Sequence, residues 1–196
     1  MFIVFEGIDG SGKTTLSKML TNFLLTKGVK AVWTREPYTE EVRKLLTEKK
    51  LDPWGETYLF LGDRAVHVNE FIKPKLEKKF TVISDRFYLS TFAYQGYGRG
   101  LNLSTLRRLN EKVTGNIKPD LTILLDIDEK KAIERLKNSR KQLDSFESYE
   151  FLSKVRRGFK KLITKEKNFL ILNAEKNPYE LLGEIIKTLS RLLSKG

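Results

Sequence analysis

The sequence predicts an α/β protein, with one domain built on a five-stranded parallel sheet that has helices on both faces. Three observations support this class. The 196 residues, 40% hydrophobic and 32% charged, suffice for one domain with a sizeable core. Short apolar runs rich in Ile, Val and Leu alternate with longer segments of helical period, as in βαβ units. No internal repeat and no Ser/Gly-rich linker divides the chain, so we expect a single domain over residues 1–196.

Five short apolar runs predict strands, because continuous apolar runs of this length are typical of strands that are buried on both faces of a sheet. In chain order they span residues 2–6, 30–34, 81–84, 121–126 and 169–173. The segments between them have apolar residues at helical spacing and predict helices at 13–27, 40–49, 55–78, 87–95, 104–114, 128–137, 147–166 and 178–194. Gly28 follows the first helix and Pro178 begins the last, which are positions that these residues favour. The polar, aperiodic stretch 137–147 predicts a mobile loop.

The first strand leads directly into a phosphate-binding motif. Residues 7–14, GIDGSGKT, match the pattern GxxxxGK[ST] between an expected strand and an expected helix, the context of a P-loop. The glycines let successive N–H groups point inward at phosphate oxygens, and the helix terminus adds a favourable dipole. Lys13 would reach the β and γ phosphates, and Thr14 would offer its hydroxyl to Mg²⁺, with Thr15 beside it. The motif predicts a nucleoside triphosphate site.

The rest of the chain indicates which kind of P-loop protein this is. A switch GTPase usually carries the signature Asn-Lys-x-Asp, and residues 173–176 do not match it. A motor ATPase needs a catalytic Glu after an apolar strand, and none directly follows Asp126. A kinase for a phosphate acceptor instead needs cations that face the triphosphate. Arg35 and Arg86 suit this role, because they follow two strands at the ligand-binding edge of the sheet and arginine grips phosphate bidentately.

Several segments along the chain carry a family resemblance. They are FEGIDGSGKTT at 5–15, TREP at 34–37, FLGDRA at 60–65, DRFYLSTFAYQGYGRG at 85–100, PDLTILLDID at 119–128 and, more loosely, the lid at 135–147. In sequence and order they resemble the thymidylate kinase family, whose members phosphorylate dTMP with ATP. The resemblance implies a P-loop nucleoside monophosphate kinase fold, with strand order 2-3-1-4-5 and Mg²⁺ as cofactor. It also implies a homodimer, with the expected helix 40–49 or 55–78 as a candidate interface.

The resemblance further implies roles for individual side chains. For the acceptor dTMP it assigns contacts to Asp9, Arg35, Phe60, Arg64, Arg86, Thr91, Tyr94 and Gln95. In this set, Phe60 stacks on thymine, Arg64 contacts the base edge, and Tyr94 crowds the ribose 2′ carbon, which disfavours ribonucleotides. For ATP it assigns Gly7, Asp9, Gly10, Ser11, Gly12, Lys13, Thr14, Thr15, Arg135 and Asn173. The expected catalytic residues are Lys13, Asp85, Arg86 and Arg140, and the expected Mg²⁺ ligands are Thr14 and Asp85.

The arginine that neutralises charge during transfer is expected in the lid. Family members keep it either in the P-loop or in the lid, and Gly10 occupies the P-loop position here. Arg140 matches the lid position, and closure of the lid would also exclude water. Many relatives have Asp-Arg-x-Glu in the lid, whereas Asp144 is followed here by Ser145.

Composition excludes other classes and leaves two alternatives open. With 0 Cys and one His, His67, the chain has no thiolate or multi-histidine zinc site, and we expect a reducing, cytoplasmic location. No apolar run is long enough to span a bilayer. The net charge of +12 is spread along the chain, so neither membrane nor nucleic acid is an expected partner. The alternatives are a related kinase for dUMP or a deoxynucleoside, and a basic nucleic-acid-binding protein with a vestigial P-loop.

Overall fold

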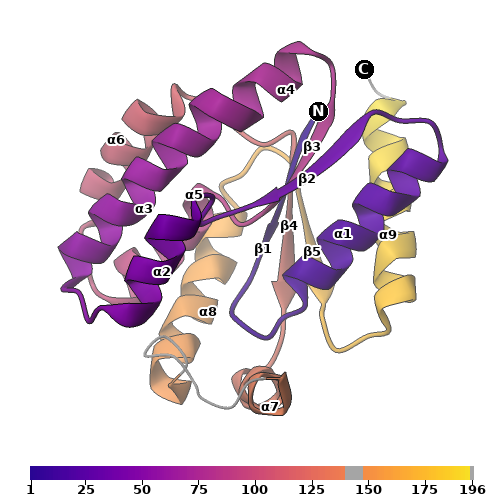
Figure 1. The fold of residues 1–196 in the computed structure, drawn as a ribbon. Helices are drawn as coiled ribbons and strands as arrows, with labels where there is room; N and C mark the ends of the chain where they lie inside the picture. The colour runs from indigo at the N-terminus through magenta and orange to yellow at the C-terminus, as the bar shows by residue number, and fades with distance from the viewer. Residues whose placement is uncertain (140–147, 195–196) are drawn as a thin grey trace.

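Five parallel strands form the centre of the computed structural model, which describes residues 1–139 and 148–194 (Figure 1). The strands are β1 Phe2–Glu6, β2 Ala31–Arg35, β3 Thr81–Asp85, β4 Leu121–Asp126 and β5 Phe169–Asn173. They are ordered β2-β3-β1-β4-β5, which confirms the α/β class and the strand order. Because β1, β3 and β4 are almost entirely buried, none of them alternates between apolar and polar residues, and β1 and β4 are nearly continuous apolar runs.

Helices cover both faces of this sheet. In chain order they are α1 Lys13–Thr26, α2 Glu40–Glu48, α3 Pro53–His67, the π-helical η1 Val68–Ile72, α4 Lys73–Glu77, α5 Tyr88–Thr91, the π-helical η2 Phe92–Gly98, α6 Leu103–Thr114, α7 Glu129–Ser139, α8 Tyr149–Ile163 and α9 Pro178–Leu193. α1 and α9 lie on one face, and α3, α6 and α8 lie on the other (Figure 1). None of the helices in the described ranges is long and apolar enough to cross a membrane.

Two expected helices differ from those observed. The helix expected over 55–78 begins at Pro53, because the Asp52 carboxylate accepts hydrogen bonds from the N–H groups of Trp54 at 2.8 Å and Gly55 at 3.1 Å. It is continuous but widens into η1 between α3 and α4. The helix expected over 87–95 is α5 followed by η2, and such π-helical turns are frequent at functional sites.

The loop expected over 137–147 is partly helical. Residues 137–139 are the last turn of α7, because the helix continues past the expected end at residue 137. The remainder of the expected lid, 140–147, lies outside the described residues, and the predicted lid residue Arg140 lies there with it.

The carboxyl ends of three strands place their following loops side by side. In register, Phe5 of β1 pairs with Asp85 of β3, and Asp85 pairs with Arg35 of β2. The P-loop after β1, the segment after β2 and residues 86–87 after β3 therefore meet at one edge. This is the edge at which open parallel sheets bind ligands.

Candidate active site

The P-loop has a tight backbone that only glycine accommodates at two positions. Gly7 and Gly10 have φ values of +146° and +80°. A Cβ on Gly7 would lie 2.6 Å from the carbonyl oxygen of Leu125, and one on Gly10 would lie 2.5 Å from that of Ala132 in α7. Position 10 therefore has no room for a side chain while α7 packs against it.

The polar groups of the P-loop are held ready for an anion. Lys13 is buried, and its Nζ donates to the carbonyl oxygen of Ile8 at 2.9 Å. Burial, with the nearby Arg86 charge, lowers the pKa of Lys13 to about 8. The hydroxyl of Ser11 is buried and has no hydrogen-bond partner within the described residues. A phosphate group would supply both the missing partner and the missing counter-charge.

Thr14 and Asp85 lie together beside the P-loop. The Thr14 hydroxyl donates to Asp85 Oδ2 at 2.5 Å, whereas the buried Oδ1 has no partner in the described part of the chain. A carboxylate and a hydroxyl next to a phosphate cradle are the oxygen ligands that Mg²⁺ prefers. The residues present therefore fit the expected cation.

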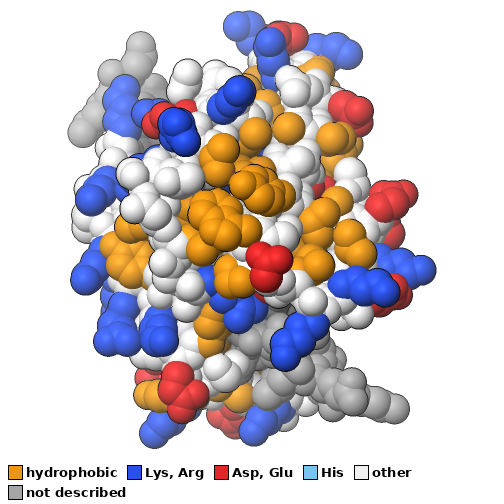
Figure 2. Space-filling model, turned by 90° about the vertical axis from the view of Figure 1, so that its left-hand side faces the viewer, with side chains coloured by type: hydrophobic (Ala, Val, Ile, Leu, Met, Phe, Trp, Pro, Cys, Tyr) orange, Lys and Arg blue, Asp and Glu red, His pale blue; other side chains and the backbone are white. Residues whose placement is uncertain are grey.

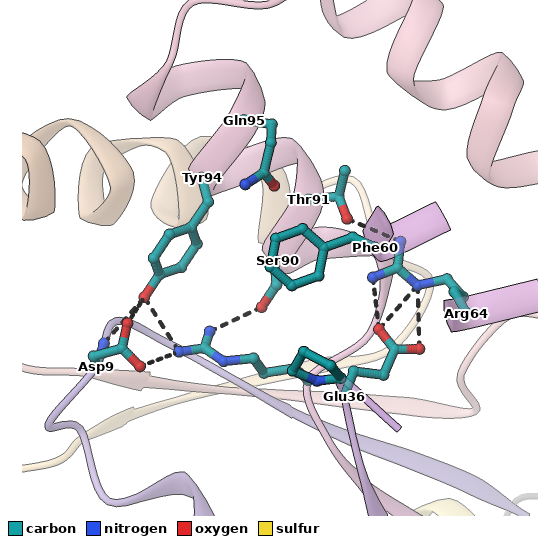
Figure 3. Close-up of a pocket in the computed structure, with 10 residues that line it drawn as sticks. Asp9, Glu36, Phe60, Arg64, Ser90, Thr91, Tyr94 and Gln95 are labelled. Atoms are coloured by element: carbon teal, nitrogen blue, oxygen red, sulfur yellow. Dashed lines mark hydrogen bonds and ion pairs between the residues drawn. The ribbon is translucent and has the colours of Figure 1, made fainter. Parts of the chain in front are cut away.

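A pocket adjoins the P-loop. It is lined by Asp9, Glu36, Pro37, Phe60, Arg64, Arg86, Ser90, Thr91, Tyr94 and Gln95. Figure 3 shows Asp9 and Tyr94 at one end and Arg64 with Glu36 at the other, with the Phe60 ring between them. We call the two ends the phosphate end, with Asp9, Arg86 and Tyr94, and the base end, with Glu36, Arg64 and Gln95.

At the phosphate end, Arg86 is paired with several oxygens. Its Nη2 donates to Asp9 Oδ1 at 2.5 Å and to the Tyr94 hydroxyl at 3.2 Å. Its Nη1 donates to the carbonyl oxygen of Gly7 at 3.1 Å and to Ser90 Oγ at 3.0 Å. Arg86 also has φ of +78°, an uncommon conformation for a side chain of this size. The backbone thus aims the guanidinium at the P-loop.

Asp9 stays ionised in this arrangement. Burial alone would raise the pKa of Asp9, but the Arg86 and Lys13 charges outweigh it and hold the pKa well below its usual range. The Tyr94 hydroxyl donates to Asp9 Oδ2 at 2.6 Å, and burial raises the Tyr94 pKa well above its usual value. At neutral pH the phosphate end therefore contains a carboxylate, a guanidinium and a neutral phenol.

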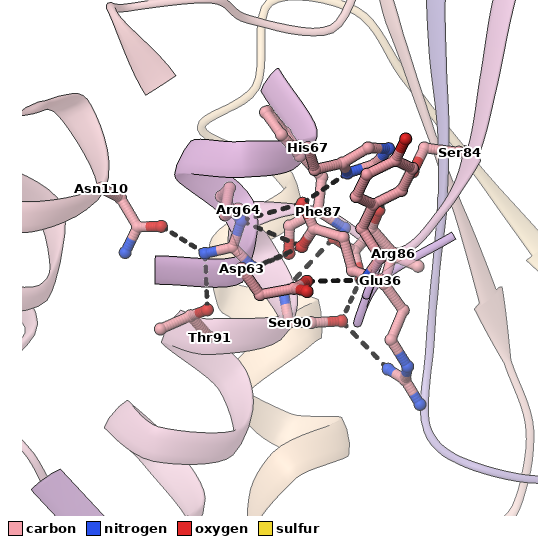
Figure 4. A network of polar contacts seen from close by, with 12 residues as sticks. Glu36, Asp63, Arg64, His67, Ser84, Arg86, Phe87, Ser90, Thr91 and Asn110 are labelled. Carbon is pink, nitrogen blue, oxygen red and sulfur yellow. Dashed lines mark hydrogen bonds and ion pairs between the residues drawn. The ribbon is translucent and has the colours of Figure 1, made fainter. Parts of the chain in front are cut away.

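At the base end, Arg64 is buried and fully hydrogen-bonded. Nε and Nη2 donate to the Glu36 carboxylate, at 2.9 Å and 2.6 Å to Oε2. Nη1 donates to Thr91 Oγ1 at 2.8 Å and Asn110 Oδ1 at 2.5 Å, as Figure 4 shows, and Nη2 also reaches the Phe87 carbonyl at 3.3 Å. These contacts account for all five N–H groups of a guanidinium.

Helix α3 also fixes the segment that follows β2. His67 places Nδ1 3.2 Å from Glu36 Oε1 and Nε2 2.7 Å from the Thr34 hydroxyl. The Asp63 carboxylate accepts the backbone N–H groups of Tyr38 at 2.6 Å and Thr39 at 2.8 Å. Glu36 is thereby held between Arg64 and His67. Burial alone would raise the pKa of Glu36, but the Arg64 charge and the hydrogen bonds from both side chains outweigh it and lower the pKa.

Gln95 is the exception at the base end. Its side chain is 1% exposed, and its Nε2 has no hydrogen-bond partner within the residues that the structure describes. A buried donor without a partner is costly. A carbonyl oxygen of a pyrimidine base in the pocket would satisfy it.

The structure brings most of the predicted acceptor residues together. Asp9, Phe60, Arg64, Arg86, Thr91, Tyr94 and Gln95 all line the pocket. Arg35 does not line it: the residue ends β2 and is half-buried, and its side chain forms no hydrogen bond or ion pair within the described residues.

The predicted ATP residues outside the P-loop lie on its other side. Arg135 of α7 donates through Nη2 to the Ala174 carbonyl at 3.0 Å and through Nη1 to the Gly10 carbonyl at 3.5 Å. Asn173, at the end of β5, accepts the N–H of Glu175 at 3.0 Å. Arg135 therefore spans from the P-loop to the turn after β5, and both predicted residues lie there.

Sequence reasoning missed several residues of the site. Glu36, Pro37 and Ser90 line the pocket, although they lie in the family motifs without a predicted role. Glu6 lies beneath them, completely buried at the end of β1. A charged residue at the end of an otherwise apolar strand, FIVFE, was the available signal for Glu6.

Comparisons with known proteins show the family of this chain. The sequence model of the thymidylate kinase family matches residues 5–186. A thymidylate kinase of Mycoplasma mobile is 39% identical over 210 residues and covers 100% of both chains. One from Desulfovibrio desulfuricans is 41% identical, covering 93% of this chain and 91% of the relative, and one from Thermosipho africanus is 41% identical, covering 94% and 95%. The chain therefore belongs to the thymidylate kinase family.

Proposed function

We propose that the protein transfers the γ phosphoryl group of ATP to dTMP, forming ADP and dTDP for dTTP biosynthesis. The observation that carries this proposal is the pocket itself, which begins at Asp9 of the P-loop and also contains the Phe60 ring and a Gln95 amide donor that has no partner among the described residues. One end suits a phosphate, and the other suits a pyrimidine.

The transfer needs positioning and charge neutralisation rather than a base. A phosphate monoester carries about −1.5 to −2 charges at pH 7, so its oxygen is already nucleophilic. Arg86, and Arg35 at the neighbouring strand end, hold this oxygen in line with the γ phosphate, while Lys13 contacts the β and γ phosphates. Thr14 and Asp85 would hold Mg²⁺, which supplies further neutralisation of the triphosphate.

The nucleoside is held by stacking and a few polar atoms. Phe60 stacks on thymine, and Gln95 donates an Nε2 proton, which has no acceptor among the described residues, to a base carbonyl. Tyr94 crowds the ribose 2′ carbon, and Asp9 contacts the 3′-hydroxyl. Arg64 reaches the base edge only by exchanging one of its existing hydrogen bonds, so we assign it a second role in orienting Thr91.

A lid arginine completes the catalytic set. Gly10 offers no side chain, and its contact with Ala132 leaves no space for one. Arg140 is then the candidate that neutralises charge on the transferring group. Arg140→Ala should lower kcat far more than it weakens ATP binding, and equal losses of both would instead indicate a binding role.

The homodimer is proposed on the face formed by α2, α3 and α6. Figure 2 shows apolar side chains gathered at the centre of this face. Tyr58 and Val66 of α3 are 61% and 37% exposed, and a Cβ added to Gly62 between them would meet no described atom within 4 Å. A second α3 can approach closely over this glycine. Gly62→Arg should give a folded monomer by light scattering, whereas an unchanged dimer would contradict this interface.

A substrate panel tests the activity. ADP release from Mg-ATP would be measured with dTMP, dUMP, dCMP, dGMP, UMP and no acceptor, and the product identified. Strong turnover with dTMP and weaker turnover with dUMP is expected. Lys13→Ala should abolish turnover while remaining folded by circular dichroism. Preferred turnover of another monophosphate would contradict the base assignment, and no turnover with any acceptor would contradict the activity.

A further inference from the structure

Glu6 is a buried carboxylate whose hydrogen bonds within the described residues all reach one segment, the start of α5. Oε1 accepts the backbone N–H groups of Phe87 at 3.0 Å and Ser90 at 3.2 Å. Oε2 accepts the hydroxyl proton of Ser90 at 2.5 Å. The last residue of β1 thus anchors the helical turn that directly follows Arg86.

These bonds continue to the Arg86 guanidinium. Because the Ser90 hydroxyl donates its single proton to Glu6, its oxygen is left to accept from Arg86 Nη1, which lies at 3.0 Å. The same Nη1 donates to the carbonyl oxygen of Gly7, the neighbour of Glu6. The anchored turn also holds Arg86 at φ of +78°, which a free chain would leave. Glu6 therefore acts on Arg86 both through Ser90 and through the backbone.

A buried carboxylate at position 6 costs folding free energy. The need for a hydrogen-bond acceptor does not by itself explain why this position has a charged residue. Burial raises the pKa of Glu6 to about 7, although Ser90, Arg86 and Phe87 all favour the charged form. The Glu36 charge raises the pKa of Glu6 further. The Glu6 charge in turn acts to raise the pKa values of Lys13 and Tyr88. A glutamine would avoid the charge, but its Nε2 cannot accept the Ser90 proton. Only a carboxylate fixes the direction of the Ser90 hydroxyl.

We propose that Glu6 is a positioning residue for phosphoryl transfer, which aims Arg86 at the acceptor phosphate through Ser90. This inference rests on the proposed function, because it needs Arg86 to bind that phosphate. Glu6 itself touches neither substrate. Its loss should therefore act on the acceptor and spare the ATP site.

Steady-state kinetics of the full chain test this assignment with Glu6→Gln, Ser90→Ala and the double variant. Each single variant should raise the KM for dTMP about tenfold, as expected for a weakened charge-assisted hydrogen bond, with the KM for ATP changed less than about twofold. The double variant should be no worse than the poorer single variant, because both break the same chain of contacts. Glu129→Gln is the matched control: Glu129 is a second buried carboxylate, which accepts a hydrogen bond from Arg156 at 3.0 Å, and its replacement should leave the KM for dTMP unchanged.

Several outcomes would overturn the inference. Equal increases of both KM values, effects that multiply in the double variant, or wild-type kinetics in Glu6→Gln would each contradict it. If Glu6→Gln does not fold, Ser90→Ala alone decides, because it keeps the Glu6 bonds to the backbone. An inactive wild-type protein would contradict the proposed function, whereas an active wild type with unaffected variants would contradict only this inference.

Discussion

The two ends of the acceptor pocket contain ion pairs of nearly the same length in different surroundings. At the phosphate end, Arg86 and Asp9 lie 2.5 Å apart with side chains 16% and 28% exposed. At the base end, Arg64 and Glu36 lie 2.6 Å apart with side chains 1% and 3% exposed. The partly exposed pair can exchange its partners for a ligand, because part of its surface is open to solvent. The buried pair cannot do so without leaving a charge uncompensated, so it supports the pocket.

Removal of Arg86 should break the phosphate end without unfolding the protein. Arg86→Ala should lower kcat/KM for dTMP by about 10³-fold, because a charge that faces the transferring group is lost. Its melting temperature should stay close to wild type, since the released Asp9 can be hydrated. Kinetics and thermal denaturation of the same sample check both statements. A large loss of stability with retained activity would contradict the claim that Arg86 serves ligand binding rather than stability.

Removal of Arg64 should instead lower the stability of the protein more than its activity. Arg64→Ala leaves the Glu36 carboxylate buried without its main partner, which costs about 3–5 kcal/mol of unfolding free energy. Urea denaturation would measure this loss, and the melting temperature should fall by about 10 °C. Activity that remains at low temperature is expected to keep a near-normal KM for ATP. A variant as stable as wild type would show that the base-end pair does not support the fold.

Two buried carboxylates, Glu6 beneath the pocket and Glu36 at the base end, should affect stability with opposite pH dependence. Glu6 has its pKa raised to about 7 from the ordinary 4.5, so between these values the folded protein holds a proton that the unfolded chain has released. Unfolding free energy therefore falls as the pH rises through this window, by up to about 3 kcal/mol from Glu6 alone. Glu36 has its pKa lowered, so its contribution is lost as the pH falls below 4.5.

Glu6→Gln and Glu36→Gln isolate these contributions. Relative to wild type, Glu6→Gln should become more stable as the pH rises through the window between about 4.5 and 7, because glutamine does not titrate. The loss of unfolding free energy in Glu36→Gln, relative to wild type, should become smaller as the pH falls. Urea denaturation at several pH values measures both differences, and pH-independent differences would show that neither group has a shifted pKa.

Tyr94 should give the smallest effect, on selectivity. Tyr94→Ala opens space at the ribose 2′ carbon, so the preference for dTMP over its ribonucleotide analogue should narrow by about tenfold. Competing-substrate assays give this ratio directly. Tyr94→Leu, which keeps part of the bulk without the phenol, separates crowding from hydrogen bonding, and an unchanged ratio in both variants would contradict the role.

The phosphate end was more predictable from sequence than the base end. The P-loop pattern and the arginine after the third strand have short local spacing, so the position of Lys13 and Arg86 followed from the strand ends. The partners of Arg64 come from residues 36, 91 and 110, and no local pattern links positions so far apart. Likewise, the bonds of Glu6 to Ser90 span 84 residues and depend on β1 pairing with β3.

Secondary structure, too, was predictable where its signal is local and not where it depends on tertiary packing. The buried strands were recognisable as apolar runs, because a parallel sheet covered on both faces has no alternation. The π-helical widening in η1 and η2 was not, because it depends on tertiary packing rather than on periodicity. Asp52 followed by Pro53 is a sequence signal for the start of a helix. The prediction missed it because it placed the boundary at residue 55 from the spacing of apolar residues alone.

Direct binding of dTMP and of thymidine tests the central claim, that the phosphate end releases Arg86 from Asp9 to bind the acceptor phosphate. Calorimetry on wild type and Arg86→Ala would give the ratio of the two affinities for each protein. We expect wild type to bind dTMP about 100-fold more tightly than thymidine, and we expect Arg86→Ala to bring this ratio close to one. A ratio that is the same in both proteins would contradict the account.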